Sequence, residues 1–168
     1  MERQSTQKNN RGYSLIELIV VVLIMGILAG AVGGGISFMR SMDVSATATE
    51  LLSLLERTRL QTIAAEEGEA VSLELYEENG KYVASIMQGG EEIDRERLVG
   101  TGMTITVYAT KSVPPETIVL EEGVAPVSFS YEKSNGAFVS RFDRIVLRGG
   151  TKEVTLFLVT GTGRCYVE

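Results

Sequence analysis

The sequence predicts an α+β protein in which a long N-terminal helix packs on a C-terminal antiparallel β domain. Two observations predict this fold class. Apolar residues dominate residues 13–40 and recur at helical spacing through residues 41–67, whereas from residue 68 onward they alternate with polar residues in short runs separated by turns. Many short strands that follow one long helix indicate a β domain that buries one face against that helix.

Residues 1–12 form a basic leader. They contain three basic residues and one acidic residue, a net charge of +2, and because the whole chain carries −6, residues 13–168 carry −8. A basic head before an apolar run is typical of a membrane-targeting segment whose positive end stays in the cytoplasm. An acidic body repels polyanions, so nucleic acid is an unlikely partner.

The segment 13–40 is predicted to be a membrane-spanning helix. From Leu18 to Met39 it has 22 residues without a formal charge, which as a helix would extend roughly 33 Å, close to the thickness of a bilayer's hydrocarbon core. Glycine weakens a helix by about 1 kcal/mol relative to alanine. The glycines that could let this helix loosen or bend are Gly26, Gly33, Gly34 and Gly35. Close helix packing in the membrane is an equally good reason for small residues here.

Residues 41–67 are predicted to form an amphipathic helix. One face gathers apolar and small residues at spacings of three and four, and these are Val44, Ala48, Leu51, Leu52, Leu55, Thr58 and Thr62. No proline separates this segment from the one before it. We therefore expect the two segments to form one long, flexed rod.

Residues 68–168 are predicted to form the antiparallel β head. Asn79-Gly80 is the signal of a tight hairpin turn between two strands. The predicted strands are residues 71–76, 81–88, 103–110, 117–121, 127–132, 144–149, 154–160 and 164–168.

The composition excludes most enzyme classes. The chain has no histidine, which removes the usual zinc sites and the common nucleophile–base pairs. Cys165 is the single cysteine, so no internal disulfide can form. The acidic runs 66–69, 91–92 and 121–122 lack the spacing of a calcium loop. We predict no catalytic residue, no metal and no cofactor, and hence no enzyme.

Glu17 is a charged residue in an otherwise apolar run. Insertion of a carboxylate at the centre of a bilayer costs about 2.5–3.5 kcal/mol of free energy, and the cost is smaller near the interface. A secretory signal peptide cut after Ala29-Gly30-Ala31 and an uncleaved membrane anchor both leave Glu17 without a role. A cut between Gly12 and Tyr13 would instead create an α-amine four residues before Glu17. That amine could pair with the carboxylate, in the same chain or in a neighbour.

The run from Arg11 to Glu17, followed by the apolar segment, resembles the type IV prepilin leader. The resemblance implies that a prepilin peptidase cuts after Gly12 and methylates the new N-terminus of Tyr13, and that Glu17 sets the register of assembly with other pilin or pseudopilin subunits. Tyr13 stands where phenylalanine is usual. Many pilins have a glycine at the position of Gly26 and a proline at that of Gly34.

Residues 48–75, 127–138 and 154–164 resemble the GspH/FimT class of minor pseudopilins, which implies a β-sandwich-like head. DNA-binding members of this class have a motif that resembles Gly-Arg-x-Arg near the C-terminus. Here Arg164 corresponds to the first arginine of that motif, and the second arginine is missing. The resemblance implies a single-pass protein of the inner membrane with a periplasmic head, which later joins a type II secretion pseudopilus or a type IV pilus. The alternative is a monomeric β-domain binding protein, exported or membrane-anchored by an ordinary signal.

Overall fold

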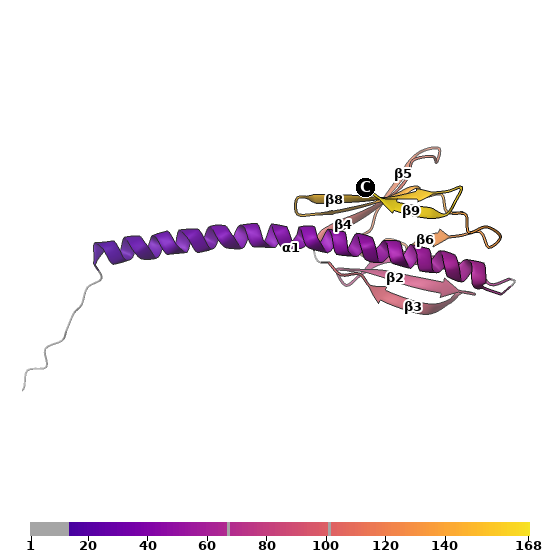
Figure 1. Ribbon diagram of the computed structural model, residues 1–168, viewed down its shortest axis with the longest axis horizontal. Coiled ribbons are helices and arrows are strands. Elements are labelled where there is room, and N and C mark those ends of the chain that lie inside the picture. Colours follow the sequence, from indigo (N-terminus) through magenta and orange to yellow (C-terminus); the bar gives the residue numbers. More distant parts are fainter. Residues whose placement is uncertain (1–13, 67, 101) are drawn as a thin grey trace, which may run out of the picture. The chain divides into compact units, whose positions relative to one another are not determined.

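The computed structural model describes residues 14–66, 68–100 and 102–168, with the backbone alone for residues 31–39. The chain divides into two compact units, Met1–Gly35 and Ile36–Glu168. Its architecture is α+β, with one N-terminal helix and two antiparallel sheets (Figure 1). The predicted fold class is confirmed to this extent.

Helix α1 runs from Leu15 to Ala64 without interruption. The two predicted helical segments are therefore one element, as the absence of proline suggested. The helix is continuous through Gly33, Gly34 and Gly35. That these glycines let the helix loosen on assembly stays a prediction. Within the described part of the chain, no helix reaches the length and hydropathy required of a membrane span.

The β head consists of two antiparallel sheets. The first has the order β3-β2-β1-β6 and the second the order β5-β4-β7-β8-β9. In chain order the strands are β1 (Val71–Glu78), β2 (Lys81–Gln88), β3 (Glu91–Arg97), β4 (Met103–Ala109), β5 (Glu116–Val119), β6 (Val127–Ser130), β7 (Arg144–Gly149), β8 (Lys152–Val159) and β9 (Arg164–Val167). Every predicted strand is present, with ends that differ by a few residues at most. The predicted hairpin is also confirmed, because Glu78 pairs with Lys81 and both Asn79 and Gly80 have positive φ.

Strand β3 was missed by the sequence analysis. Its residues, EEIDRER, are mostly charged and show no apolar alternation. It forms because it pairs with β2 along its length, and it lies at the edge of its sheet, where both of its faces can remain polar. Two ion pairs hold its side chains, Arg57–Asp94 at 2.6 Å and Arg95–Glu78 at 2.5 Å.

The core lies between the two sheets and the second half of α1. In Figure 1 this half of the helix lies between β8 and β9 on one side and β2 and β3 on the other. The helix contributes Val44, Ala48, Leu51, Leu54 and Leu55 to a cluster that includes buried residues from both sheets. The predicted apolar face is therefore the buried one, except that Leu52 is only half-buried and Thr47 and Leu54 are buried in addition.

Buried polar groups tie these layers together. The hydroxyl of Tyr82 on β2 donates to the carbonyl oxygen of Met103 at 3.2 Å and accepts from the amide of Ile105 at 3.3 Å, so it links one sheet to the other. Burial raises the pKa of this hydroxyl, which keeps it protonated and able to donate. On α1, the buried hydroxyls of Thr58 and Thr62 each donate to the carbonyl one turn earlier, at 2.8 Å.

The core packing predicts a large difference between two leucines of α1. Leu55 is fully buried, whereas Leu60 is 57% exposed on the same helix. We expect Leu55→Ala to lower the free energy of unfolding by about 2–5 kcal/mol because it leaves a cavity. Leu60→Ala should change it by less than about 0.5 kcal/mol. Chemical denaturation followed by circular dichroism measures both, and equal effects would contradict the packing.

Candidate functional site

The candidate site is the N-terminal end of the chain. Gly12 and Tyr13, the predicted cleavage residue and new N-terminus, lie outside the described residues. Glu17 is described and lies in the first turn of α1. The geometry of the site therefore begins at Ser14.

Ser14 caps the start of α1. It immediately precedes the first helical residue, Leu15, and its side-chain oxygen accepts from the amide of Glu17 at 3.3 Å. Its carbonyl oxygen accepts from the amides of Glu17 and Leu18 at 3.0 and 3.2 Å. Serine is a favoured N-cap because its hydroxyl satisfies an amide that the helix leaves unpaired. This cap was not predicted from the sequence, although Ser-x-x-Glu before an apolar run is a known signal of a helix start.

The carboxylate of Glu17 is exposed and has no hydrogen-bond or ion-pair partner among the residues that the structure describes. Its position in the first turn places negative charge near the positive end of the helix dipole, which is favourable. It remains available to bind a cation that the described chain does not supply.

Around Glu17 the helix exposes apolar side chains on every side. From Leu15 to Leu28 its large apolar side chains are between 46% and 79% exposed. No described atom lies within 4 Å of the position that a Cβ on Gly26 would occupy, so no described residue requires a glycine there. A helix that is apolar all round is normally buried in protein or lipid. The surroundings of this segment therefore come from outside the described chain.

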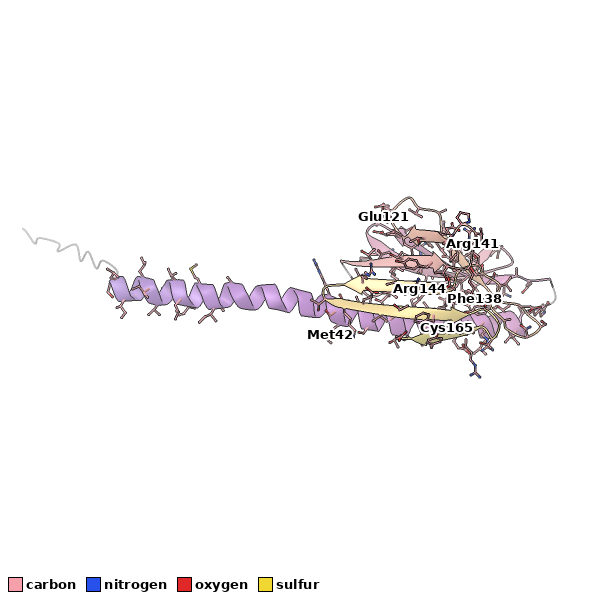
Figure 2. All side chains as sticks on the ribbon, turned by 90° about the horizontal axis from the view of Figure 1, so that it is seen from above. Met42, Glu121, Phe138, Arg141, Arg144 and Cys165 are labelled. Atoms are coloured by element: carbon pink, nitrogen blue, oxygen red, sulfur yellow. The ribbon has the colours of Figure 1, made fainter. Side chains whose placement is uncertain are left out.

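The arginines that could have formed a basic patch are mostly engaged. Arg141 pairs with Glu116 at 3.0 Å and Arg148 with Glu153 at 2.6 Å, while Arg144 lies 4.8 Å above the ring of Tyr108. Figure 2 labels Arg141 and Arg144 in the head. Arg164, on β9, is exposed and forms no ion pair within the described residues. The expectation that nucleic acid is not a partner stays a prediction.

Cys165 lies half-buried on β9 and packs against the core (Figure 2). Burial raises the pKa of its thiol to about 11. Burial is also the main cause that raises the pKa of the neighbouring Tyr131 hydroxyl, and Cys165 adds to that effect. A thiol that remains protonated at neutral pH is a poor nucleophile. Among the described residues, no three candidate ligands gather as a metal site would require.

Residues 7–33 match the family profile of the prokaryotic N-terminal methylation motif, which is the signal of type IV prepilins. The chain carries a prepilin-type signal. The matched range includes Gly12, Tyr13 and Glu17. No curated protein and no solved structure matches the chain.

The signal indicates a type IV pilin-like protein that prepilin peptidase processes and that assembles with other pilins. It suggests a structural subunit rather than an enzyme, with export to a membrane-anchored or pilus-associated location. The match ends at residue 33, so it does not extend to the β head.

The environment of Cys165 predicts slow alkylation. At pH 8 we expect iodoacetamide to react at least about tenfold more slowly with the folded protein than with free cysteine, because few of the Cys165 thiols are ionised. The rate should rise as the pH approaches 11, where the thiol loses its proton. Mass spectrometry of timed samples measures the rate. Unfolding in urea should remove the protection, and equal rates in the folded and unfolded protein would contradict the assignment.

Proposed function

We propose that this chain is a minor pilin or pseudopilin subunit that is cut after Gly12 and methylated on Tyr13. It then assembles through α1 into a type II secretion pseudopilus or a type IV pilus. The observation that carries the proposal is the match of residues 7–33 to the methylation motif. The carboxylate of Glu17, which has no partner in the part of the chain that the structure describes, and the apolar surface around it support the assembly step.

Glu17 is proposed to bind the α-amine that cleavage creates. In a low-dielectric environment an isolated carboxylate is costly, and so is an isolated ammonium group. Their pairing offsets both costs. If the amine belongs to a neighbouring subunit, the pair forms only when the two helices are in one axial register, and Glu17 then acts as an assembly device.

The apolar surface of the helix is proposed to serve in two successive environments. Before assembly, residues 13–40 hold the subunit in the inner membrane, with the basic leader on the cytoplasmic side and the head in the periplasm. During assembly the same side chains leave the lipid and pack against the helices of other subunits. Gly26 and the cluster Gly33, Gly34 and Gly35 are proposed to let the helix melt locally at this stage, because glycine opposes helix formation by its backbone entropy.

The head is proposed to resemble the GspH/FimT class of minor pseudopilins. Two antiparallel sheets packed on the second half of the N-terminal helix fit the β-sandwich-like head that the sequence resemblance implied. We infer that the head faces the periplasm or the cell exterior and contacts the heads of neighbouring subunits.

The mature N-terminus separates the proposed function from its alternatives. We expect intact-mass and peptide mass spectrometry of the protein from native membranes to find a chain that begins at Tyr13 and carries one methyl group. A chain that begins at Val32 would indicate an ordinary signal peptidase and an exported binding domain. A chain that begins at Met1 would indicate an uncleaved anchor, and either result would overturn the proposal.

Replacement of Glu17 tests the assembly role separately from cleavage. We expect both Glu17→Ala and Glu17→Gln to leave cleavage largely intact and to lower incorporation into filaments at least about tenfold, since an unpaired amine is left in an apolar environment. Glu17→Gln keeps the shape of the side chain, so its failure would identify the charge as the cause. Glu77→Gln, in the head, is the matched control and should incorporate normally. Normal incorporation of Glu17→Gln would contradict the pairing.

A further inference from the structure

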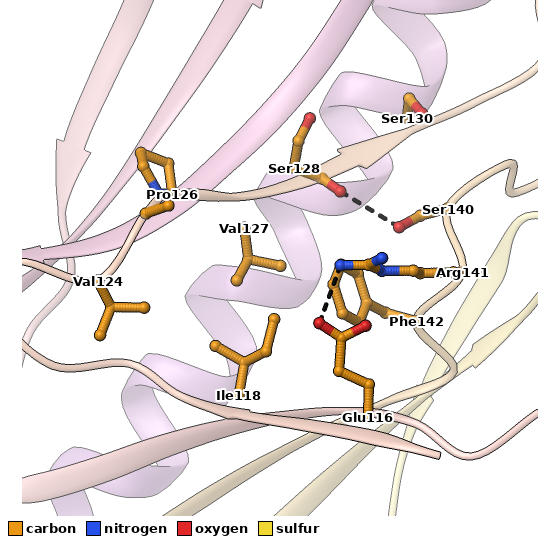
Figure 3. Close-up of a pocket in the computed structure, with 11 residues that line it drawn as sticks. Glu116, Ile118, Val124, Pro126, Val127, Ser128, Ser130, Ser140, Arg141 and Phe142 are labelled. Atoms are coloured by element: carbon orange, nitrogen blue, oxygen red, sulfur yellow. Dashed lines mark hydrogen bonds and ion pairs between the residues drawn. The ribbon is translucent and has the colours of Figure 1, made fainter. Parts of the chain in front are cut away.

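The head contains a pocket between the edges of its two sheets. It has a volume of about 610 Å³ and is lined by residues of β5, of the segment 124–126, of β6 and of the segment 140–142 (Figure 3). Its apolar wall includes Ile118, Val124, Val127 and Phe142. Strand β5 is the last strand of one sheet and β6 the last strand of the other. The pocket therefore lies at a side of the head where no further strand continues either sheet.

The mouth of this pocket is partly closed by charged and polar contacts. Arg141 donates to the Glu116 carboxylate at 3.0 Å, and the Ser140 hydroxyl donates to the carbonyl oxygen of Ser128 at 3.2 Å (Figure 3). Arg141 also lies 5.1 Å from the ring centroid of Phe142. The volume is in the range of pockets that bind a small ligand or the tip of a loop.

The loop between β4 and β5, residues 110–115, presents an apolar tip that no described residue covers. Its sequence is TKSVPP, and Val113 is 98% exposed, more than any other large apolar residue described in the chain. Pro114 and Pro115 beside it are exposed as well. Because Val113 is almost fully exposed, the loop does not fill the pocket of its own chain.

This loop is held in place at its base. The backbone amide of Thr110 donates to the Asp143 carboxylate at 2.7 Å, and the Thr110 hydroxyl donates to the other oxygen of the same carboxylate. The amide of Ser112 donates to the carbonyl oxygen of Ala109 at 3.3 Å. Two successive prolines fix their own φ angles. A loop that is already ordered loses less entropy when it binds.

The charges beside the loop and beside the pocket are complementary. Lys111 in the loop is exposed and forms no ion pair with any described residue. Glu121 and Glu122, which follow β5 and precede the pocket residue Val124, are also exposed and unpaired within the described chain. Opposite charges at the rim of a contact fix its orientation more than they add to its affinity.

We propose that the 110–115 loop of one copy of this chain inserts Val113 into the β5–β6 pocket of a second copy, with Lys111 beside Glu121 and Glu122 of that copy. The contact joins two different surfaces of the same chain. Such heterologous contacts extend into open helical assemblies unless their rotation closes a ring. The proposal rests on the proposed function, because it names a lateral contact between assembled heads.

Site-specific cross-linking of full-length chains tests the contact. In a Cys165→Ser background, one tagged copy carries Val113→Cys and a differently tagged copy carries Val124→Cys, so that no disulfide can form within a chain. Both copies are expressed together and treated with a mild oxidant in native membranes. We expect a disulfide between the two tagged chains. In the matched control, the second copy carries Val159→Cys in place of Val124→Cys. Both valines are 37% exposed, so their accessibility is equal. Val159 lies at the end of β8, outside the pocket lining, and should not form the disulfide.

A charge exchange tests the orientation. Lys111→Glu in the Val113→Cys copy should lower the cross-linked fraction about threefold, as expected for an exposed ion pair. Glu121→Lys with Glu122→Lys in the other copy should restore it. Any one of four results would overturn the proposal. The first two are the absence of a disulfide between the tagged chains and equal cross-linking through Val159→Cys. The other two are a cross-link only to a protein of different mass and a cross-linked fraction that the charge exchange does not restore.

The same samples keep this inference separate from the proposed function. Mass spectrometry of the N-terminus reports processing, and sedimentation of filaments reports assembly. Chains that begin at Tyr13 and sediment as filaments without the disulfide would overturn the loop contact and leave the proposed function standing. The disulfide in chains that keep residues 1–12 would support the contact and overturn the proposed function.

Discussion

The buried stripe of α1 is the contact on which the head depends. Val44, Leu51 and Leu55 are fully buried, and the cluster they belong to contains residues of both sheets. The helix therefore packs against apolar residues of both sheets in one continuous core. The buried hydroxyls of Thr58 and Thr62 donate to the helix's own carbonyls, whereas that of the equally buried Thr47 donates to the carbonyl oxygen of Val99 and so ties the helix to the head.

The same helix meets two different requirements along its length. In residues 40–64 one face is apolar and buried, while the other carries exposed groups such as Glu56 and Arg57. From Leu15 to Leu28 every large side chain except Glu17 is apolar and exposed. An amphipathic surface suits a helix at a protein–water boundary, and a uniformly apolar one suits lipid or the packed helices of a filament. A single continuous helix can therefore serve as part of a folded head and as an assembly element.

The turns of the head show what sequence patterns can and cannot predict. The Asn79-Gly80 turn was predictable because two residues with positive φ are enough to specify a tight hairpin. Gly136 and Gly163 also have positive φ, and they lie far apart in the sequence. A Cβ on Gly163 would collide with the carbonyl oxygen of Gly136, and Arg59 of α1 donates to that same oxygen at 3.0 Å. Only the folded chain brings these three residues together.

The sequence by itself determined the helix, its apolar face, the strands with alternating residues, and the signal around Gly12, Tyr13 and Glu17. These features depend on neighbouring residues, whose spacing fixes which side chains share a face. The tertiary structure alone decided that the charged segment Glu91–Arg97 is a strand, that Leu54 is buried, and that β5 and β6 enclose a pocket. Each of these depends on contacts between residues far apart in the chain, and the local pattern of apolar and polar residues does not encode such contacts.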